Sequence, residues 1–368
     1  MGGRRERSVH PVHQGRVRPR LHPGHRPRPR AARGALLTAR RQEPGIVAGT
    51  VERQGAGQPA GVLAAGLDLT RAGLPALTGS GQAPPAGPIV DLHVHSTASD
   101  GNLAPETVVE RASAAGLAAI SLTDHDTVAG VPAAVAAGER LGVRVLSGCE
   151  FSTSAPWGEM HVLGYFLPTD SAPLETFLAR CRADRMRRAR AMVDRLQGMG
   201  VSLDFEDVLR QAGGGAVGRP HVARAIVRGG GALGMSEAFD RYIGRGRPAF
   251  VEKVLPSFRE VADLVHAVRG LVSVAHPKDR GTRSFIERLK SEGLDAIETR
   301  HPSHDPDVRS RLTDLSLRLG LLRTGGSDWH GDPEPGESHG ALGSQEVPLE
   351  WLERLDRVHA ELPTAAAP

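Results

Sequence analysis

Histidine and acidic side chains recur along residues 91–330 of this 368-residue chain, each group at or beside a short apolar segment. Mixed imidazole and carboxylate ligands suit Mn²⁺, Zn²⁺ or Fe²⁺ better than Ca²⁺ or Mg²⁺ alone. Nine candidates exceed what one ion needs, so the sequence predicts two or three divalent ions, bridged by the centrally placed Glu150. The candidate ligands are His93, His95, Asp100, His125, Glu150, His161, His276, Asp328 and His330.

The alternative for any single histidine is a hydrogen-bonded core or surface residue. The joint pattern argues against that alternative, because six of the twelve histidines after residue 88 occupy these positions beside acidic residues. Burying so many polar groups without a cation would desolvate all of them at once. The chemistry these residues predict is a metal centre that generates a nucleophilic hydroxide near neutral pH and clamps the attacking and leaving oxygens of an in-line displacement.

Short β-rich segments alternate with helical ones after Pro88, which predicts an α/β fold with a parallel sheet or barrel. The candidate ligands fall at or near strand ends, the face on which such barrels build active sites. Residues 170–250 lack strand patterns, so we expect barrel segments at 88–168 and 251–362 and a helical insertion at 169–250. The predicted strands cover residues 89–95, 117–123, 143–149, 160–166, 271–275, 294–299 and 321–324.

Residues 1–87 have a different composition. Residues 1–88 contain 14 arginines, no lysine and four acidic residues, a net charge of +10, so the remaining 32 basic and 38 acidic residues carry −6. Proline, glycine and arginine dominate this segment, which predicts a disordered basic leader. A basic arm that contacts RNA or a membrane is the alternative.

The rest of the composition narrows the class of protein. No segment approaches the roughly 18 apolar residues of a membrane span. Only Cys149 and Cys181 are present, which indicates a reducing compartment. We therefore expect a cytoplasmic protein without a membrane partner, and nothing in the sequence indicates an obligate protein partner.

The motifs together resemble those of the PHP (polymerase and histidinol phosphatase) superfamily, over residues 88–345. The branch they resemble most contains nucleoside 3′,5′-bisphosphate phosphatases and 5′→3′ oligoribonucleotide exonucleases. The residues that carry the resemblance are Asp91-Leu92-His93-Val94-His95-Ser96, Asp100-Gly101, Leu122-Thr123-Asp124-His125-Asp126-Thr127, Gly148-Cys149-Glu150, His161, Ala275-His276-Pro277 and Gly326-Ser327-Asp328-Trp329-His330.

The resemblance implies a distorted (β/α)7 barrel, the PHP fold, with three metal ions. By motif, His93, His95, Glu150 and Asp328 would hold one ion. Asp100, His125 and His330 would hold a second, and Glu150, His161 and His276 a third. The implied activity is hydrolysis of nucleotide phosphate monoesters, first of all the 3′-phosphate of nucleoside 3′,5′-bisphosphates, with trimming of short RNA from its 5′ end as a further activity. The metal expected first is Mn²⁺, with Zn²⁺ or Fe²⁺ as alternatives.

Substrate contacts are predicted at two places. Gly218-Arg219-Pro220-His221 resembles the phosphate-contacting element of the branch, with Arg219 binding phosphate and His221 binding phosphate or protonating the leaving alkoxide. Its alternative is a helix that simply starts at Pro220. His301 and His304 follow a strand end, and His304 is a further candidate for substrate binding.

Two groups of charged residues receive structural interpretations. Asp91, Asp124 and Asp126 are expected to orient ligating imidazoles. The arginines of one helix are expected on a solvated face rather than along a nucleotide path. These arginines are Arg180, Arg182, Arg185, Arg187, Arg188 and Arg190.

Rival functions remain open at this stage. A histidinol-phosphatase-like enzyme would share the metal chemistry and differ in substrate. A non-catalytic PHP domain associated with a polymerase is another alternative, although no polymerase domain is present and the ligand set is complete. An RNA-binding protein acting through the basic leader is a third.

Overall fold

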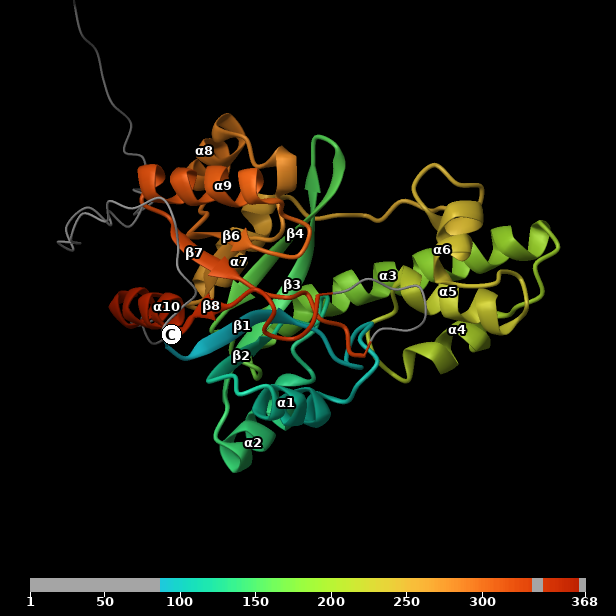
Figure 1. Ribbon diagram of the computed structural model, residues 1–368. Helices are drawn as coiled ribbons and strands as arrows, with labels where there is room; N and C mark the ends of the chain where they lie inside the picture. The colour runs from blue at the N-terminus through green and yellow to red at the C-terminus, as the bar shows by residue number, and fades with distance from the viewer. Residues whose placement is uncertain (1–86, 333–339, 364–368) are drawn as a thin grey trace, which may run out of the picture. The chain divides into compact units, whose positions relative to one another are not determined.

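The computed structural model describes residues 87–332 and 340–363. Apart from Gly87, the predicted leader lies outside these residues. Eight strands form one sheet in the order β7-β6-β5-β4-β3-β2-β1-β8 (Figure 1). Helices cover the outside of this nearly closed barrel, so the predicted α/β barrel is confirmed.

The sheet has two parallel parts. β1 (Ile89–Val94), β2 (Ala119–Leu122) and β3 (Arg144–Ala155) pair in parallel. β5 (Leu271–Val274), β6 (Ala296–Arg300) and β7 (Leu322–Gly325) form the second parallel part. β8 (Val347–Pro348), which the sequence pattern did not predict, adds antiparallel to β1.

The fourth strand departs from the parallel arrangement. β4 (Gly158–Tyr165) pairs antiparallel with both β3 and β5. Only Pro156 and Trp157 join β3 to β4, and a connection this short makes a hairpin rather than a parallel crossover. His161 lies in the first half of β4, where it pairs with Ser152 of β3. It therefore reaches the same end of the barrel as Glu150 without lying at the carboxyl end of its own strand.

The barrel nearly closes between the ends of β1 and β7. The backbone N–H of Asp328 donates to the His93 carbonyl at 2.9 Å, and the N–H of His95 donates to the Trp329 carbonyl at 2.9 Å. Gly326 permits this approach, because a Cβ there would overlap the Cβ of His93. Closure thus places His93 at the end of β1, and His95 just after it, beside an aspartate more than 230 positions away in the chain.

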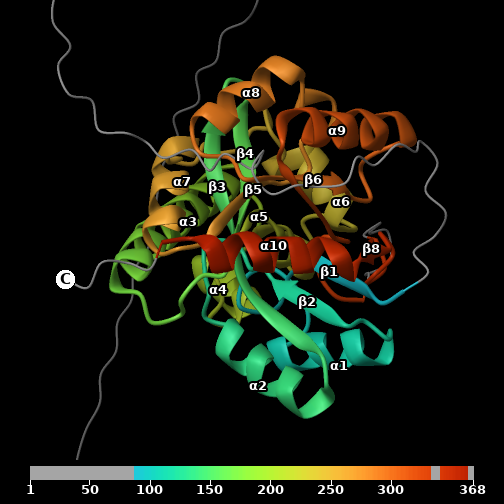
Figure 2. The ribbon, with the colours of Figure 1, turned by 90° about the vertical axis from the view of Figure 1, so that its left-hand side faces the viewer.

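Apolar residues of strands and helices pack together around the barrel. α1 (Pro105–Ala114) and α2 (Val131–Leu141) pack on each other next to β2. α9 (Pro306–Leu319) packs on β6, and α8 (Arg283–Ser291) lies beside α9 (Figure 2). The remaining barrel helices are α7 (Phe258–Ala267), the 3₁₀ turn η3 (Lys278–Arg280) and α10 (Leu349–Glu361). The shared core includes Ile120, Val162, Val274, Ile297, Val108, Ala134, Val261 and Leu312.

The insertion between β4 and α7 is helical, as predicted. It contains α3 (Ala172–Gly198), α4 (Phe205–Ala212), α5 (Arg219–Arg228), α6 (Met235–Ala238) and the π-helical turn η2 (Phe239–Ile243). Its own apolar core includes Met192, Leu196, Val208, Ile226 and Ile243. Asp204 begins α4 with a reciprocal capping box, accepting the Asp207 N–H at 2.9 Å. Within the described part of the chain, no helix combines the length and apolarity that a membrane crossing requires.

Candidate metal centre

Glu150 occupies the centre of a cluster that contains all nine predicted ligands. Its side chain is 1% exposed. It faces five imidazoles, which come from the ends of β1, β2 and β5 and from β4. Oε2 lies 3.3, 3.2 and 3.2 Å from ring nitrogens of His93, His95 and His125, and Oε1 lies 2.9 and 3.1 Å from those of His161 and His276. One carboxylate shared in this way has the geometry of a bridging ligand.

Asp328 completes a group with His93, His95 and Glu150. Its Oδ1 lies 3.3 Å from Nε2 of His93 and 3.1 Å from Nε2 of His95. The backbone of Asp328 has φ of 53°, and that of His276 has φ of 28°. Side chains other than glycine rarely adopt this region, and such strain concentrates at functional sites.

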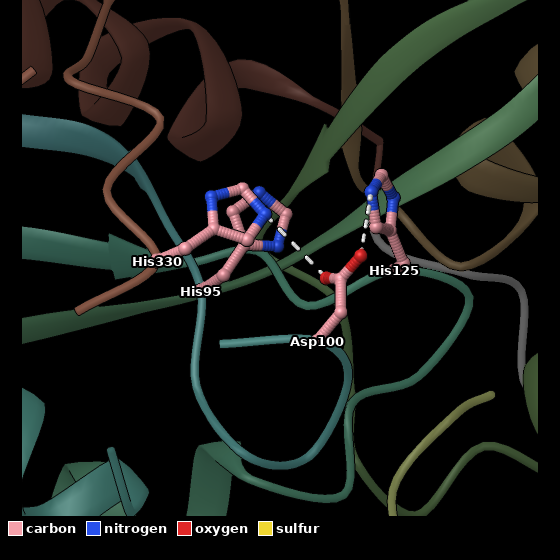
Figure 3. Close-up of side chains that lie close together, drawn as sticks. All are labelled: His95, Asp100, His125 and His330. Atoms are coloured by element: carbon pink, nitrogen blue, oxygen red, sulfur yellow. Dashed lines mark ion pairs between the residues drawn. The ribbon is translucent and has the colours of Figure 1, made fainter. Parts of the chain in front are cut away.

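A second group surrounds Asp100. His330 Nε2 lies 3.5 Å from Oδ1 of Asp100 and His125 Nε2 lies 3.9 Å from Oδ2 (Figure 3). The rings of His95 and His330 stack with centroids 4.1 Å apart. One nitrogen or oxygen from each of these four residues falls within 4.8 Å of all the others. His95 therefore adds to the set of three that the family resemblance implies here.

Several buried atoms of the cluster lack a hydrogen-bond partner within the described part of the chain. They are Nε2 of His93, both ring nitrogens of His95, Oδ1 of Asp100 and Nδ1 of His125. Unpaired buried polar atoms are costly and uncommon in folded proteins. Divalent cations would satisfy them, and the mixture of nitrogen and oxygen donors fits such ions. The cluster can therefore hold divalent metal ions.

The electrostatics of the cluster also fit cations. Burial alone would lower the pKa of His95, but contacts with Asp328 and Glu150 outweigh burial and raise its pKa to about 10. Burial would raise the pKa of Glu150, yet the surrounding imidazoles hold it well below the usual value. The carboxylates thus remain charged, and their field attracts positive charge of any kind to the centre.

Glu298 is a functional residue that the sequence patterns missed. It is fully buried on β6, where its Oε1 accepts a hydrogen bond from Nδ1 of His93 at 3.0 Å. Its Oε2 accepts the backbone N–H of His276 at 2.6 Å. A carboxylate on Nδ1 turns Nε2 of His93 toward the cluster and strengthens it as a ligand. The available signal was an acidic residue after Ala296 and Ile297, inside the strand predicted at 294–299.

The expectation that Asp91, Asp124 and Asp126 orient imidazoles is wrong. Asp91 accepts the backbone N–H groups of Ser327 and Gly343, at 2.9 and 2.8 Å. Asp124 accepts from the backbone and hydroxyl of Ser96 and from the Ser99 hydroxyl, which fixes the loop that carries Asp100. These carboxylates therefore hold the backbone of ligand-bearing loops, and Asp126 pairs with an arginine instead.

The insertion supplies that arginine. Arg185 is 5% exposed, and its Nε donates to Oδ2 of Asp126 at 2.6 Å. Arg188, one turn further along α3, is 4% exposed. Arg180, Arg187 and Arg190 are exposed, as expected of a solvated face. That expectation is wrong for Arg185 and Arg188, because the helix packs this face against barrel loops and α5.

The predicted substrate residues lie in different surroundings. Arg219 is half-buried in the first turn of α5, and no carboxylate partner is recorded for it among the described residues. His221 is buried, its Nδ1 accepts the Gly218 N–H at 2.9 Å, and burial lowers its pKa to about 4. Both ring nitrogens of His304 contact backbone groups, of Lys278 and Thr299. The predicted substrate roles of His221 and His304 stay predictions.

His301 lies at the edge of the cluster. Its Nε2 is 3.4 Å from Oδ2 of Asp328, and it forms a possible ligand group with His93 and Glu298. Its Nδ1 lies 2.7 Å from the Ser303 hydroxyl. Its position next to Asp328 makes it the better of the two histidines after β6 for contact with the centre.

Comparison with known proteins places this geometry in a family. The family model described as the PHP domain matches residues 91–200. A 5′-3′ exoribonuclease (Rnm) of Salmonella typhimurium is 33% identical over 66% of this chain and 85% of its own length. A 3′,5′-nucleoside bisphosphate phosphatase of Chromobacterium violaceum is 34% identical over 68% of this chain and 90% of its own. The solved structure of an inferred metal-dependent phosphoesterase of Bifidobacterium adolescentis superposes with a TM-score of 0.69 at 32% identity, covering 74% of this chain and 96% of the other.

Proposed function

The chain belongs to the PHP domain family, and from this premise we propose that it is a metal-dependent phosphatase of nucleotides that removes the 3′-phosphate of nucleoside 3′,5′-bisphosphates. The observation that carries the proposal is the convergence of nine imidazole and carboxylate ligands around Glu150. Two or three divalent ions would occupy the cluster, Mn²⁺ first, with Zn²⁺ or Fe²⁺ as alternatives.

The proposed ligand sets follow the groups of side chains whose nitrogen and oxygen atoms lie close together. His93, His95, Glu150 and Asp328 would hold one ion, and Asp100, His125 and His330, joined by His95, a second. Glu150, His161 and His276 would hold a third. When bound, such ions supply Lewis acidity and a hydroxide nucleophile near neutral pH.

The chain's own residues would bind the phosphate ester and neutralise part of its charge. Hydrolysis forms a bond between phosphorus and the oxygen of water, breaks the bond between phosphorus and the ribose oxygen, and leaves the proton of water on that oxygen. The half-buried members of the cluster are His125, His161, His276, His330 and Asp328, so the substrate would approach from their side. Arg219 would bind a phosphate oxygen through its guanidinium fork.

His221 would position Arg219. The hydrogen bond from the Gly218 N–H to Nδ1 of His221 fixes the first turn of α5, where Arg219 lies. A buried imidazole with a lowered pKa is neutral at pH 7, which favours this positioning role over the predicted role as an acid. His304 stays a candidate for substrate binding with less support, since its nitrogens contact backbone groups.

Trimming of short RNA from the 5′ end is a second proposed activity, supported by the Salmonella relative. Both activities hydrolyse esters of a nucleotide and would use the same centre. The two cysteines of the chain are free, which supports the further proposal of a cytoplasmic location.

The test uses the purified full-length protein and a generic aryl phosphate with Mn²⁺. We expect hydrolysis that a chelator abolishes and added Mn²⁺ restores. The double variant His93→Ala/Asp328→Ala should lose this activity, since both residues belong to one ligand group with His95 and Glu150. An unchanged rate in that variant would exclude the mechanism. A comparison of adenosine 3′,5′-bisphosphate with histidinol phosphate then separates the proposed activity from a histidinol phosphatase.

A further inference from the structure

His301 follows β6, and the hydrogen bonds of its ring decide which nitrogen carries the proton. The backbone N–H of Ser303 donates to Nδ1 of His301 at 3.0 Å, and the Ser303 hydroxyl lies 2.7 Å from the same nitrogen. A backbone N–H can only donate, so Nδ1 accepts and carries no proton. In the uncharged ring the single proton is therefore on Nε2, which makes Nε2 a hydrogen-bond donor.

The donor nitrogen of His301 lies next to one oxygen of Asp328. Nε2 is 3.4 Å from Oδ2 of Asp328, at the long end of the hydrogen-bond range. The other oxygen, Oδ1, lies 3.3 Å from Nε2 of His93 and 3.1 Å from Nε2 of His95. The two oxygens of this carboxylate thus have different neighbours, because Oδ1 faces candidate metal ligands and Oδ2 faces a ring N–H.

His304, three residues after His301, has the opposite proton arrangement. Its Nε2 accepts the backbone N–H of Lys278 at 3.3 Å, so its proton is on Nδ1, which lies 3.3 Å from the Thr299 carbonyl. Backbone groups therefore use both nitrogens of His304, and its ring links the segment after β5 to β6. Of the two histidines, His301 is the one whose ring N–H is directed to a side chain of the cluster.

His301 also belongs to a possible ligand group with His93 and Glu298, but the contacts of this group do not favour an ion there. Oε1 of Glu298 accepts Nδ1 of His93 at 3.0 Å, and Oε2 accepts the backbone N–H of His276 at 2.6 Å. A protonated Nε2 on His301 offers no lone pair to a cation. The geometry therefore favours a donor role for His301 over a role as a metal ligand.

The burial of His301 argues against direct contact with a substrate. Only 6% of the residue is exposed, whereas 26% of the Asp328 side chain is exposed. The ring of His301 lies among other rings, with centroids 5.0 Å from that of His276 and 5.5 Å from that of His304. A substrate would thus reach Asp328 more readily than His301, which suits a residue that acts through Asp328.

We propose that His301 is a positioning residue for Asp328, whose Oδ2 it holds through Nε2–H so that Oδ1 alone faces the ion that His93 and His95 would share. This inference rests on the proposed function, in which the cluster holds divalent ions. A carboxylate can bind such an ion through one oxygen or through both. An Asp328 held to one oxygen would leave a coordination position for water or a phosphate oxygen, as metal sites of catalysis need.

The experiment measures Mn²⁺ binding to the metal-free, full-length protein by calorimetry, without a nucleotide. His301→Leu removes the donor, whereas His301→Gln keeps an amide N–H near the place of Nε2. We expect the apparent Kd for Mn²⁺ to rise about 10- to 100-fold in His301→Leu, as for other partners of metal ligands, and less than about threefold in His301→Gln. Recovery in the glutamine variant is the result that a merely structural role would not give.

Two further variants make the result specific. His301→Asn is polar, but its shorter amide does not reach the place of Nε2, so it should lose Mn²⁺ affinity as His301→Leu does. His266→Leu is the matched control, because His266 is an exposed histidine of α7 that contacts the carboxylate of Asp295 through Nε2 at 2.8 Å. It should bind Mn²⁺ as the wild type does.

Steady-state rates on adenosine 3′,5′-bisphosphate give a second readout. If His301 acts through Asp328, saturating Mn²⁺ should bring kcat of His301→Leu to within about threefold of the wild type and leave KM unchanged. A raised KM together with unchanged Mn²⁺ affinity would mean that His301 contacts the substrate, and would overturn the positioning role.

The outcomes separate the role of His301 from the proposed function. Equal loss of Mn²⁺ affinity in His301→Leu and His301→Gln, or no loss in either, overturns the positioning role and leaves the phosphatase proposal standing. A wild-type protein that shows the expected Mn²⁺ affinities across the variants but hydrolyses no nucleotide overturns the phosphatase proposal and supports the role of His301.

Discussion

The barrel cluster and the helical insertion both bury polar atoms that lack hydrogen-bond partners within the described residues, but the chemical type of these atoms differs. The cluster buries carboxylates and imidazoles, several of whose ring nitrogens lack hydrogen-bond partners within the described residues, and it can therefore hold cations. The insertion buries Arg188, whose Nη2 lacks a hydrogen-bond partner within the described residues, and Arg219 lines the same small cavity. The buried groups without partners are thus metal ligands in the cluster and a cation in the insertion.

The contacts between the regions are themselves polar. Arg185 of α3 pairs with Asp126, which follows the ligand His125, and Arg224 of α5 donates to the Asp100 carbonyl at 3.2 Å. Both contacts reach barrel loops that carry cluster residues. The insertion is therefore attached at the site of the proposed chemistry, where its position decides how an anion meets the ions.

The largest expected effect comes from removing the charge at the centre of the cluster. Glu150→Gln keeps the shape of the side chain but removes the one charge that five imidazoles share. We expect bound metal to fall below half of the wild-type content and kcat/KM to fall at least about 1,000-fold. Metal content after dialysis and phosphatase rates check both.

Glu139→Gln, on the exposed face of α2, is the matched control and should behave as the wild type. A Glu150→Gln protein that retains its full metal content would show that Glu150 is no bridge. In that case the cluster would not depend on one shared carboxylate, and its contrast with the insertion would fail on this point.

The attachment of the insertion is the next point to test. Arg185→Met leaves Asp126 buried without its counter-charge, and breaking a buried ion pair in this way costs about 3 kcal/mol of unfolding free energy. Urea unfolding at pH 7 measures the loss. Arg187→Met, two positions away on the exposed face, should cost less than about 0.5 kcal/mol.

The pH dependence of the difference in unfolding free energy tests whether the ion pair is its cause. Burial raises the pKa of Asp126, but Arg185 and other cations outweigh burial and lower the pKa below its usual value of 3.8. The stability that the pair contributes is therefore present above pH 3.8 and lost as the pH falls through the lowered value. The difference between wild type and Arg185→Met should narrow toward acid pH. A difference that stays constant would mean that the lost stability comes from packing.

The sequence predicted the barrel cluster better than the insertion for a physical reason. His93 and Glu150 lie on buried strands and His95 directly follows one, so alternation and strand ends decide which side chains meet. Arg185 and Arg188 lie on a long helix with arginines on several faces, and the covered face depends on packing that periodicity does not describe. Glu298 was missed because an acidic residue inside a predicted strand, away from its end, belongs to no motif. The direction of β4 was missed because a two-residue turn was not recognised between two apolar segments.

The smallest of the expected effects tests whether Glu298 acts on the cluster through His93. Glu298→Gln keeps an acceptor for the His276 N–H but removes the charge that contacts Nδ1 of His93. Such outer partners typically change metal affinity 10- to 100-fold. We expect a loss of about that size at limiting Mn²⁺ and recovery of kcat in excess Mn²⁺, with exposed Glu287→Gln as the unaffected control. Recovery distinguishes Glu298 from Glu150, because excess metal would refill a weakened site but would not replace a missing bridge. A Glu298→Gln protein that excess Mn²⁺ fails to restore would place Glu298 among the groups that the reaction itself needs.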